Sequence, residues 1–273
     1  MPLRALPAIR SLAEEGWPTL WTTAIVDSNP IAEGVFVHRA RPSFPRFELV
    51  SEFQTLGLYT RPAPGRKNRT REKEVISIST AETEELKSIT EFLRSYGQGK
   101  EFYPCYHEND FLNGRRFPGL GKEDILVARK KEDIVGVCAV WDQSCFKQIV
   151  VHGYTGSLNV LRPVVNTAGP ILGMKKLPSP GKTIPSATLT AVAVKNDDIA
   201  VWRRLLDAAV DRAWRKGQDY LLAGFSLRSP LLTEAKQRRH ILYKSRMYAF
   251  GFHGLIPNAY NKKAEPYMEI AAL

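Results

Sequence analysis

The sequence predicts an α/β (α+β) fold, in which a mixed sheet is flanked by helices. Short apolar segments at 186–194 and 220–226 have the length and composition of buried strands. Between them, residues 199–216 place apolar side chains at steps of three and four, the period of an amphipathic helix. Alternating segments at 124–130 and 133–142 predict an antiparallel hairpin. A strand, a helix and a strand in succession, beside a hairpin, indicate this fold class.

The first residues repeat the order of the later ones. A predicted helix at 3–15 ends at Gly16, as the later helix ends at Gly217. Pro30 corresponds to Pro230, and each precedes a predicted short helix. A shift of about two hundred residues that holds across several elements is typical of a duplicated unit.

The repeat predicts two units of unequal size. Residues 1–61 would form the C-terminal half of one unit, residues 62–74 a basic linker, and residues 75–273 a complete second unit. The strand at 21–27 in the half unit would have an unpaired edge. We therefore expect this edge to pack against the second unit or against another protomer in a homo-oligomer, or the native start to lie upstream of Met1.

Each unit is expected to close with two strands. These strands are predicted at 45–53 and 54–60 in the first unit, and at 239–250 and 266–273 in the second.

The second unit opens with a strand and a helix. The strand is predicted at 75–79, and the helix at 82–97 has a capped start at Thr80, Thr83 and Glu84. A short helix is expected within 101–120, with loops on either side. The excursion at 143–185 has no such clear pattern, and we expect it to be a lid or a packing surface.

The helix predicted at 199–216 has clear signals at both ends. Asn196 or Asp197 is expected to cap its start, Asp198 suits the positive end of its dipole, and Gly217 ends it. A strand that leads into a helix start leaves unpaired N–H groups beside the end of the strand. Anions bind at such a position.

Composition limits the function classes. The chain has 273 residues, 44% of them hydrophobic, which suffices for ordinary cores. Cys105, Cys138 and Cys145 show no metal-binding spacing, so no metal site is predicted and reduced thiols are expected. No apolar segment is long enough to span a bilayer, and we expect a soluble, cytoplasmic protein without a membrane partner. Residues 61–73 contribute much of the net charge of +11 and lack interleaved aromatic residues, so nucleic-acid binding is disfavoured.

The order of these elements resembles that of the GCN5-related N-acetyltransferases (GNAT), here as a tandem member with a truncated N-terminal copy. The resemblance implies a mostly antiparallel sheet and the transfer of an acyl group from acetyl-CoA or another acyl-CoA to an unidentified amine. It assigns the pantetheine arm to the backbone of Ala191, Val192, Ala193 and Val194, and the following loop, with Asn196, to the diphosphate.

Two departures from the family pattern support an alternative. The loop at 195–198 has no glycine, and its carboxylates at Asp197 and Asp198 would repel a diphosphate. The alternative is a catalytically silent binding or assembly protein with the same fold. In the front unit, Asn29 and Ala32 match the family's Asn-x-x-Ala segment.

The candidate catalytic residues follow from the chemistry of acyl transfer. The reaction needs a base for the amine and an acid for the leaving thiolate. Tyr243, on the strand after the helix at 230–239, is the candidate acid, and Asp142 or His152 is the candidate base. The candidate substrate contacts on the same side of the fold are Lys147, as an anion contact, with His107 and Glu108.

Overall fold

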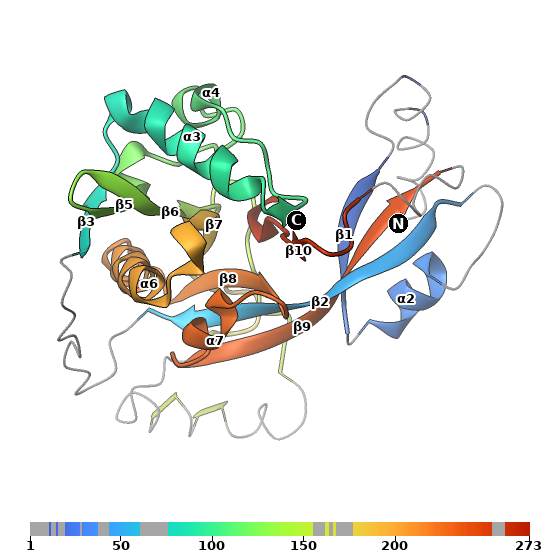
Figure 1. The fold of residues 1–273 in the computed structure, drawn as a ribbon. Helices are drawn as coiled ribbons and strands as arrows, with labels where there is room; N and C mark the ends of the chain where they lie inside the picture. The colour runs from blue at the N-terminus through green and yellow to red at the C-terminus, as the bar shows by residue number, and fades with distance from the viewer. Residues whose placement is uncertain are drawn as a thin grey trace.

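The computed structural model describes residues 11, 15, 20–27, 29–37, 44–60, 76–154, 162–163, 166–167, 177–252 and 260–273. Within these ranges eight strands form one mixed sheet in the order β1-β9-β2-β8-β7-β6-β5-β3 (Figure 1). Their bounds are β1 (Trp21–Val26), β2 (Arg46–Tyr59), β3 (Ile76–Thr80), β5 (Ile125–Lys130), β6 (Asp133–Asp142), β7 (Ser186–Val194), β8 (Tyr220–Ser226) and β9 (His240–Gly251). Only the β7–β8 pair is parallel among the strand pairs of this sheet.

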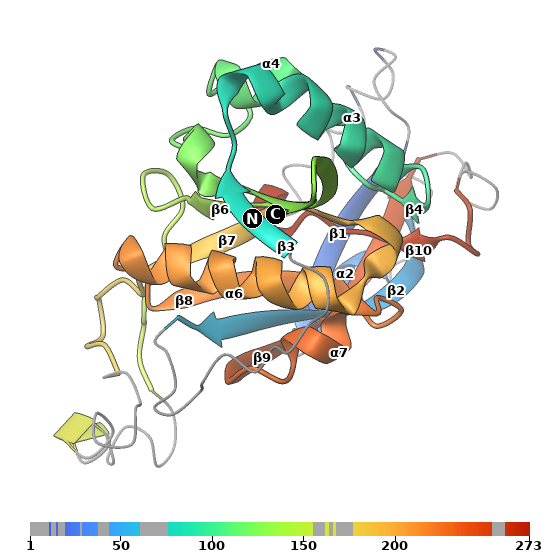
Figure 2. The ribbon, with the colours of Figure 1, turned by 60° about the vertical axis from the view of Figure 1, so that its left-hand side comes forward.

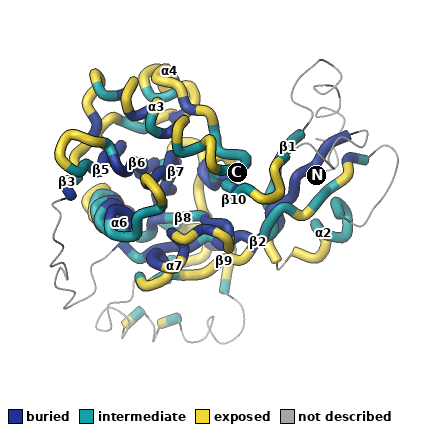
Figure 3. Tube along the Cα trace, viewed as in Figure 1, coloured by how far each residue is buried: buried dark blue, intermediate teal, exposed yellow. Residues whose placement is uncertain are grey.

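Helices cover both faces of the sheet. On one face lie α3 (Leu86–Gly97) and α4 (Glu108–Leu112), and on the other lie α6 (Ile199–Arg215) and α7 (Leu231–Ala235) (Figures 1 and 2). The short α2 (Pro30–Phe36) accompanies β1 and has no buried residue. Burial is accordingly densest around β5 to β8 and α6 (Figure 3).

The amphipathic pattern of α6 is confirmed. Its apolar side chains, among them Trp202, Leu205 and Leu206, are fully buried against the sheet. Gly217 follows the helix with a φ of +77°, which glycine adopts at no steric cost. The C-terminal end is tied to the sheet by Asp124, which is 1% exposed and binds Arg212 and Lys216. These two ion pairs leave no buried charge uncompensated.

The start of α6 differs from the expectation. Asp198, and neither Asn196 nor Asp197, is the N-cap, because its Oδ1 accepts hydrogen bonds from the backbone N–H groups of Ala200 and Val201 at 2.8 and 3.3 Å. Asn196 and Asp197 instead have φ values of +55° and +50° in the turn before the helix. Asn and Asp tolerate this conformation better than other residues with a Cβ.

The prediction of two strands at 45–53 and 54–60 is wrong, because the chain runs through both as the single strand β2. This strand lies between β8 and β9 and pairs antiparallel with each. The sheet of the predicted second unit, 75–273, therefore contains a strand from the predicted first unit, 1–61. The two form one continuous sheet, and β1 extends it by pairing with β9.

The register has a local two-fold relation. Val26 of β1 lies opposite Ser245 of β9, and Ser226 of β8 lies opposite Phe53 of β2. Phe53 and Ser245 also lie opposite each other. The long strands β2 and β9 are thus related by a local two-fold axis at this pair. Each lies between the other long strand and a shorter one, β8 for β2 and β1 for β9.

The predicted strand at 266–273 is also wrong. Glu265–Pro266 (β10) pairs with Lys100–Glu101 (β4) in a separate two-stranded ladder, and Ile270–Ala272 forms a 3₁₀ turn. The position between β8 and β9 that a last strand could take is filled by β2. The last residues instead cross the face of the sheet that carries α3, where Met268 and Ile270 pack against Phe53 and Met247.

Most other elements agree with the sequence. The structure confirms the strands at β1, β3, β5, β6, β7, β8 and β9, the helices α2, α3, α4, α6 and α7, and the charged turn of the hairpin at Lys131. The remaining 3₁₀ turns are Thr83–Glu85, Lys122–Asp124 and Lys195–Asp197. The predicted cap at Thr80, Thr83 and Glu84 is wrong, because Glu82 and Glu85 cap the 3₁₀ turn Thr83–Glu85 that leads into α3. The linker at 62–74, most of the helix at 3–15 and part of the excursion at 143–185 lie outside the described residues.

Replacing Leu56 by alanine tests whether β2 belongs to the same cooperative unit as the C-terminal elements. Leu56 is fully buried and belongs to the core cluster that contains the apolar side chains of α6 and α7. We expect Leu56→Ala to lower the free energy of unfolding by about 2–5 kcal/mol, measured by urea denaturation of the whole chain. Leu49→Ala, on the same strand but 50% exposed, should cost less than about 1 kcal/mol. Equal effects of the two variants would contradict this view of β2.

Candidate active site in the cleft between β7 and β8

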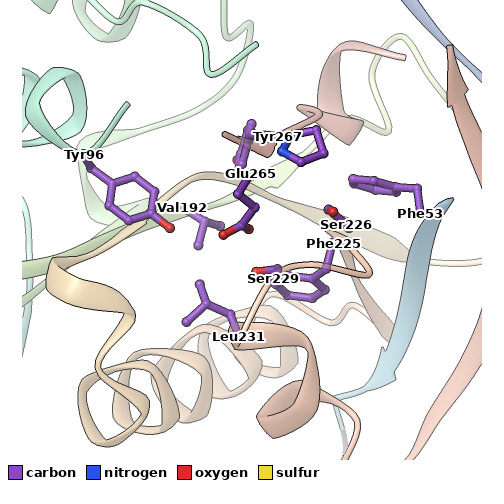
Figure 4. Close-up of a pocket in the computed structure, with 11 residues that line it drawn as sticks. Phe53, Tyr96, Val192, Phe225, Ser226, Ser229, Leu231, Glu265 and Tyr267 are labelled. Carbon is purple, nitrogen blue, oxygen red and sulfur yellow. The ribbon is translucent and has the colours of Figure 1, made fainter. Parts of the chain in front are cut away.

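A cleft opens where the parallel strands β7 and β8 separate. The two strands pair only from Ser186 to Thr188 and from Tyr220 to Leu222, and then diverge. The cleft is lined by Phe53, Tyr96, Val192, Gly224, Phe225, Ser226, Ser229, Leu231, Glu265, Pro266 and Tyr267 (Figure 4). Its free volume is about 20 Å³, which is room for one or two water molecules. Side chains of the protein itself therefore fill most of it.

A β-bulge on β7 turns backbone groups toward this cleft. Val137 lies opposite Ala193 and Ala139 opposite Thr190, so Ala191 and Val192 together face the single residue Cys138. Ala191 has a φ of +51°, a conformation that costs a residue with a Cβ some strain. Bulges of this kind release backbone groups from the ladder and re-aim them, and they occur next to active sites.

The released N–H of Ala191 donates to a carboxylate. Its acceptor is Oε2 of Glu269 at 3.1 Å, from the C-terminal end of the described chain. The same oxygen accepts from the hydroxyl groups of Tyr106 at 2.8 Å and Tyr267 at 3.2 Å. Three donors thus converge on one anionic oxygen, which is how proteins stabilise an oxyanion.

Residues 265–273, here called the C-terminal strap, are held across the cleft by further contacts. The carbonyl oxygen of Ala271 accepts from Nε2 of Gln143 at 2.7 Å, and Gln143 is buried. Tyr267 donates its backbone N–H to the carbonyl of Glu101 at 2.8 Å. The strap alternates its side chains as an extended segment does. As a result Met268 packs on the sheet while Glu269 reaches the bulge.

Of the tyrosines around Glu269, Tyr106 is fully buried and Tyr103 and Tyr267 are partly buried, and all three remain protonated. Burial, and then the neighbouring charge of Glu269, raises the pKa of Tyr103, Tyr106 and Tyr267 well above the usual value for a phenol. A protonated hydroxyl can donate, and Tyr103 does so to the carbonyl oxygen of Val192 at 3.0 Å. A backbone group of each bulge residue of β7 is therefore hydrogen-bonded to a side chain in or beside the cleft.

Charged groups close the end of the cleft nearest α6. Asp197 accepts from the hydroxyl of Tyr96 at 2.7 Å and from Nζ of Lys100 at 2.9 Å. Lys100 also binds Glu265 of the C-terminal strap. Figure 4 shows Tyr96 and Glu265 directed toward the same space. Asp197 is thereby tied to both α3 and the strap.

The N-terminus of α6 holds its own anion. The Asp198 carboxylate occupies the N–H groups of Ala200 and Val201 and also binds Nζ of Lys130 at 3.3 Å. Burial raises the pKa of Asp198, but these hydrogen bonds and the Lys130 charge outweigh it, so the pKa lies below its ordinary value. The amide groups at which the sequence predicts anion binding are therefore partly occupied by a side chain of the chain itself.

The structure brings some of the predicted cofactor contacts to the cleft. Val192 lines the cleft and Ala191 adjoins it in the bulge, whereas Ala193 and Val194 pair with β6. Asn196 lies in the turn between β7 and α6.

The predicted catalytic residues are more dispersed. Asp142 accepts hydrogen bonds from the N–H of Ser144 and from Nε2 of Gln218, both at 2.9 Å, and so joins β6 to the turn before β8. His152 is exposed in the segment after β6. Tyr243 is 51% exposed on β9 and does not line the cleft. Their catalytic roles stay predictions.

The predicted substrate contacts also lie apart from one another. His107 and Glu108 are exposed at the start of α4, with Nε2 of His107 3.6 Å from Sγ of Cys105. Lys147 donates from Nζ to the main-chain oxygen of Leu273, and burial lowers the pKa of this ammonium. Lys147 therefore contacts the C-terminal strap.

Sequence reasoning missed Glu269 and the tyrosines that surround it. Residues 266–273 are short and mostly apolar, as a buried strand is, and only the position of β2 in the sheet shows that this segment has no place there. Tyr103 and Tyr106 belong to a segment that was expected to be loop. Pro266, which cannot donate to a ladder, was the available signal against a central strand.

The described residues contain no group of three or more His, Cys, Asp or Glu side chains that could hold a metal ion. Within the same ranges, no helix has the length and apolar character needed to cross a membrane.

Comparison with solved structures identifies the fold. A GCN5-related N-acetyltransferase from Sphaerobacter thermophilus superposes with a TM-score of 0.50 over 90% of this chain and 68% of that protein, at 12% sequence identity. The chain has the GNAT fold. A GCN5-related N-acetyltransferase from Kribbella flavida gives the same TM-score over 96% of this chain and 80% of that one, at 10% identity. No protein-family model matches the sequence, and no curated protein matches it.

Replacing Asp198 tests its role as the cap of α6. Asp198→Ala removes the acceptor for two N–H groups, and we expect it to lower the free energy of unfolding by about 1 kcal/mol. Asp198→Asn keeps a capping oxygen and should cost only a few tenths of this at neutral pH.

The free energy of unfolding of the wild type should exceed that of Asp198→Asn by a small amount that decreases as the pH falls. Because folding lowers the pKa of Asp198, the charge stabilises the fold above the ordinary value of 3.8, and this part is lost as the pH falls through the lower folded pKa. Urea denaturation at several pH values measures it. An advantage that grows toward acid would contradict this assignment.

Proposed function

We propose that this protein transfers an acyl group from an acyl-CoA to an amine. The observation that carries the proposal is the N–H of Ala191, which a bulge releases from the ladder and which donates to a carboxylate oxygen of Glu269. Ala191 adjoins Val192, which lines the cleft between β7 and β8. The carbonyl oxygen of a thioester gains negative charge during acyl transfer, and a fixed N–H donor at that oxygen stabilises the charge. The GNAT fold agrees with this chemistry.

The residues fit the reactive end of an acyl-CoA. Ala191 N–H offers a donor to the thioester oxygen, and the carbonyl of Val192 offers an acceptor to an amide N–H of an extended pantetheine arm, in the manner of an added strand. The hydroxyl of Thr190, fully buried just before the bulge, has no hydrogen-bond partner among the described residues, which suits a polar ligand beside it. An acyl-CoA would supply the activated acyl group.

The residues do not fit the diphosphate end as they stand. The Asp198 carboxylate occupies the first N–H groups of α6, and Asp197 adds a second negative charge to the same turn. A diphosphate would meet both charges. We therefore propose that binding relies on the pantetheine arm and gains little from the nucleotide.

A second candidate function is favoured by the contents of the cleft. With a free volume of about 20 Å³ and the C-terminal strap across it, the cleft resembles a closed interior more than a channel. The protein would then keep the GNAT fold as a catalytically silent binding or assembly module. The free edge of β1, at one end of the sheet of described strands, would be its surface for homo-oligomerisation.

We also propose that the two halves of the sheet descend from one duplicated unit. The equivalence of Val26 with Ser226, and of Phe53 with Ser245 in the register, supports this relation. The position of Pro30 at the start of α2 and of Pro230 at the start of α7 agrees with it.

Calorimetric titration with acetyl-CoA and with S-acetylpantetheine tests the proposed activity. We expect both to bind, with affinities that differ by less than about tenfold, because the start of α6 already holds a carboxylate. Absence of heat with either ligand at millimolar concentration would favour the silent function. A hundredfold preference for acetyl-CoA would contradict the proposed weak role of the nucleotide.

A further inference from the structure

Donors from three segments meet at Glu269, on the strap beside the cleft. Ala191 comes from β7, Tyr106 from the segment before α4, and Tyr267 from the C-terminal strap itself, and all three donate to Oε2. Two of these donors stay in place without the strap. An oxygen of a bound ligand that used them would have to take the place of Oε2, because one N–H and one hydroxyl cannot serve two oxygens equally well.

We propose that Glu269 is an internal competitor for the acyl thioester, so that the C-terminal strap must leave the cleft before an acyl-CoA can bind. This inference rests on the proposed function and concerns the regulation of the same site. The strap is then a self-inhibitory segment, and its carboxylate oxygen stands where the thioester carbonyl oxygen would be held.

The fit between the strap and the sheet supports a specific closed state. Ile270 packs over Gly224 of β8, and a Cβ at that glycine would collide with the Ile270 side chain and with the ring of Phe53. Met268 and Ile270 are 5% and 8% exposed, so release of the strap would expose two large apolar side chains to water. The closed state therefore predominates until a ligand supplies a better occupant of the cleft.

The strap is also held by polar contacts that a ligand could exchange. Gln143 binds the carbonyl of Ala271, Lys147 binds the main-chain oxygen of Leu273, and Lys100 binds Glu265. Each of these partners lies on the body of the domain and each keeps a donor for another acceptor if the strap departs. Release of the strap thus leaves the side chains of Gln143, Lys147 and Lys100 as hydrogen-bond donors on the body of the domain.

Two strap variants and one charge control test the inference. Glu269→Ala removes the competing oxygen, and Gly224→Ala pushes Ile270 away without touching Glu269. Glu132→Gln removes one exposed carboxylate from the β5–β6 turn, far along the chain from the strap. Thermal unfolding of each variant establishes that the fold persists.

The first measurement needs no ligand. Hydrogen exchange of peptides covering residues 265–273 should become at least about tenfold faster in Glu269→Ala and Gly224→Ala than in the wild type, and stay unchanged in Glu132→Gln. Unchanged exchange in both strap variants, with the fold intact, would overturn the inference whatever the protein binds.

The second measurement uses acetyl-CoA and calorimetry. If only a fraction of wild-type molecules has an open cleft, the apparent Kd is raised by the inverse of that fraction. We expect Glu269→Ala and Gly224→Ala to bind acetyl-CoA at least about tenfold more tightly than the wild type and Glu132→Gln. Equal binding by all four proteins would overturn the inference while leaving the proposed function intact. Absence of binding by all four, with faster exchange in the strap variants, would overturn the proposed function and this role of Glu269 with it.

Discussion

The candidate site depends on the early end of parallel pairing between β7 and β8. Only three residues of each strand are paired, and the bulge at Ala191 and Val192 follows directly on β7. A sheet interior with unpaired backbone groups is costly unless other groups answer them. The fold therefore requires something to lie in the cleft. In this conformation that requirement is met by Tyr103 and by the carboxylate of Glu269.

The same requirement explains why the strap carries a carboxylate, Glu269, on the side that faces the bulge. A buried carboxylate is costly unless several donors surround it. Glu269 meets this condition through the Ala191 amide and two phenols that burial keeps protonated. The same donors therefore serve stability and reactivity. They stabilise the Glu269 carboxylate in this conformation, and a tetrahedral intermediate would need them for its negative oxygen.

Local patterns in the sequence predict the elements of this fold well, and long-range pairing less well. The apolar segment of β7 and the apolar face of α6 depend on neighbours in the sequence, so both are confirmed. The place of β2 between β8 and β9 depends on residues far along the chain, and no local pattern encodes it. The misassigned segment at 266–273 follows from that error, since its expected place in the sheet was already filled.

The candidate site was predictable to the same extent. The backbone contacts at Ala191 and Val192 follow from the resemblance to a known fold and from the strand before α6. The partners of those groups do not, because Tyr106 and Glu269 are 163 residues apart in the sequence and meet only in the folded chain.

The pairing of β2 with a strand far along the chain also affects biosynthesis. Ser51 and Ser226, whose hydroxyls touch across β2 and β8, are separated by 175 residues, so β2 waits on the ribosome for roughly 10–35 s before its partner is translated. During that interval an apolar strand with two bare edges is a natural client for chaperones.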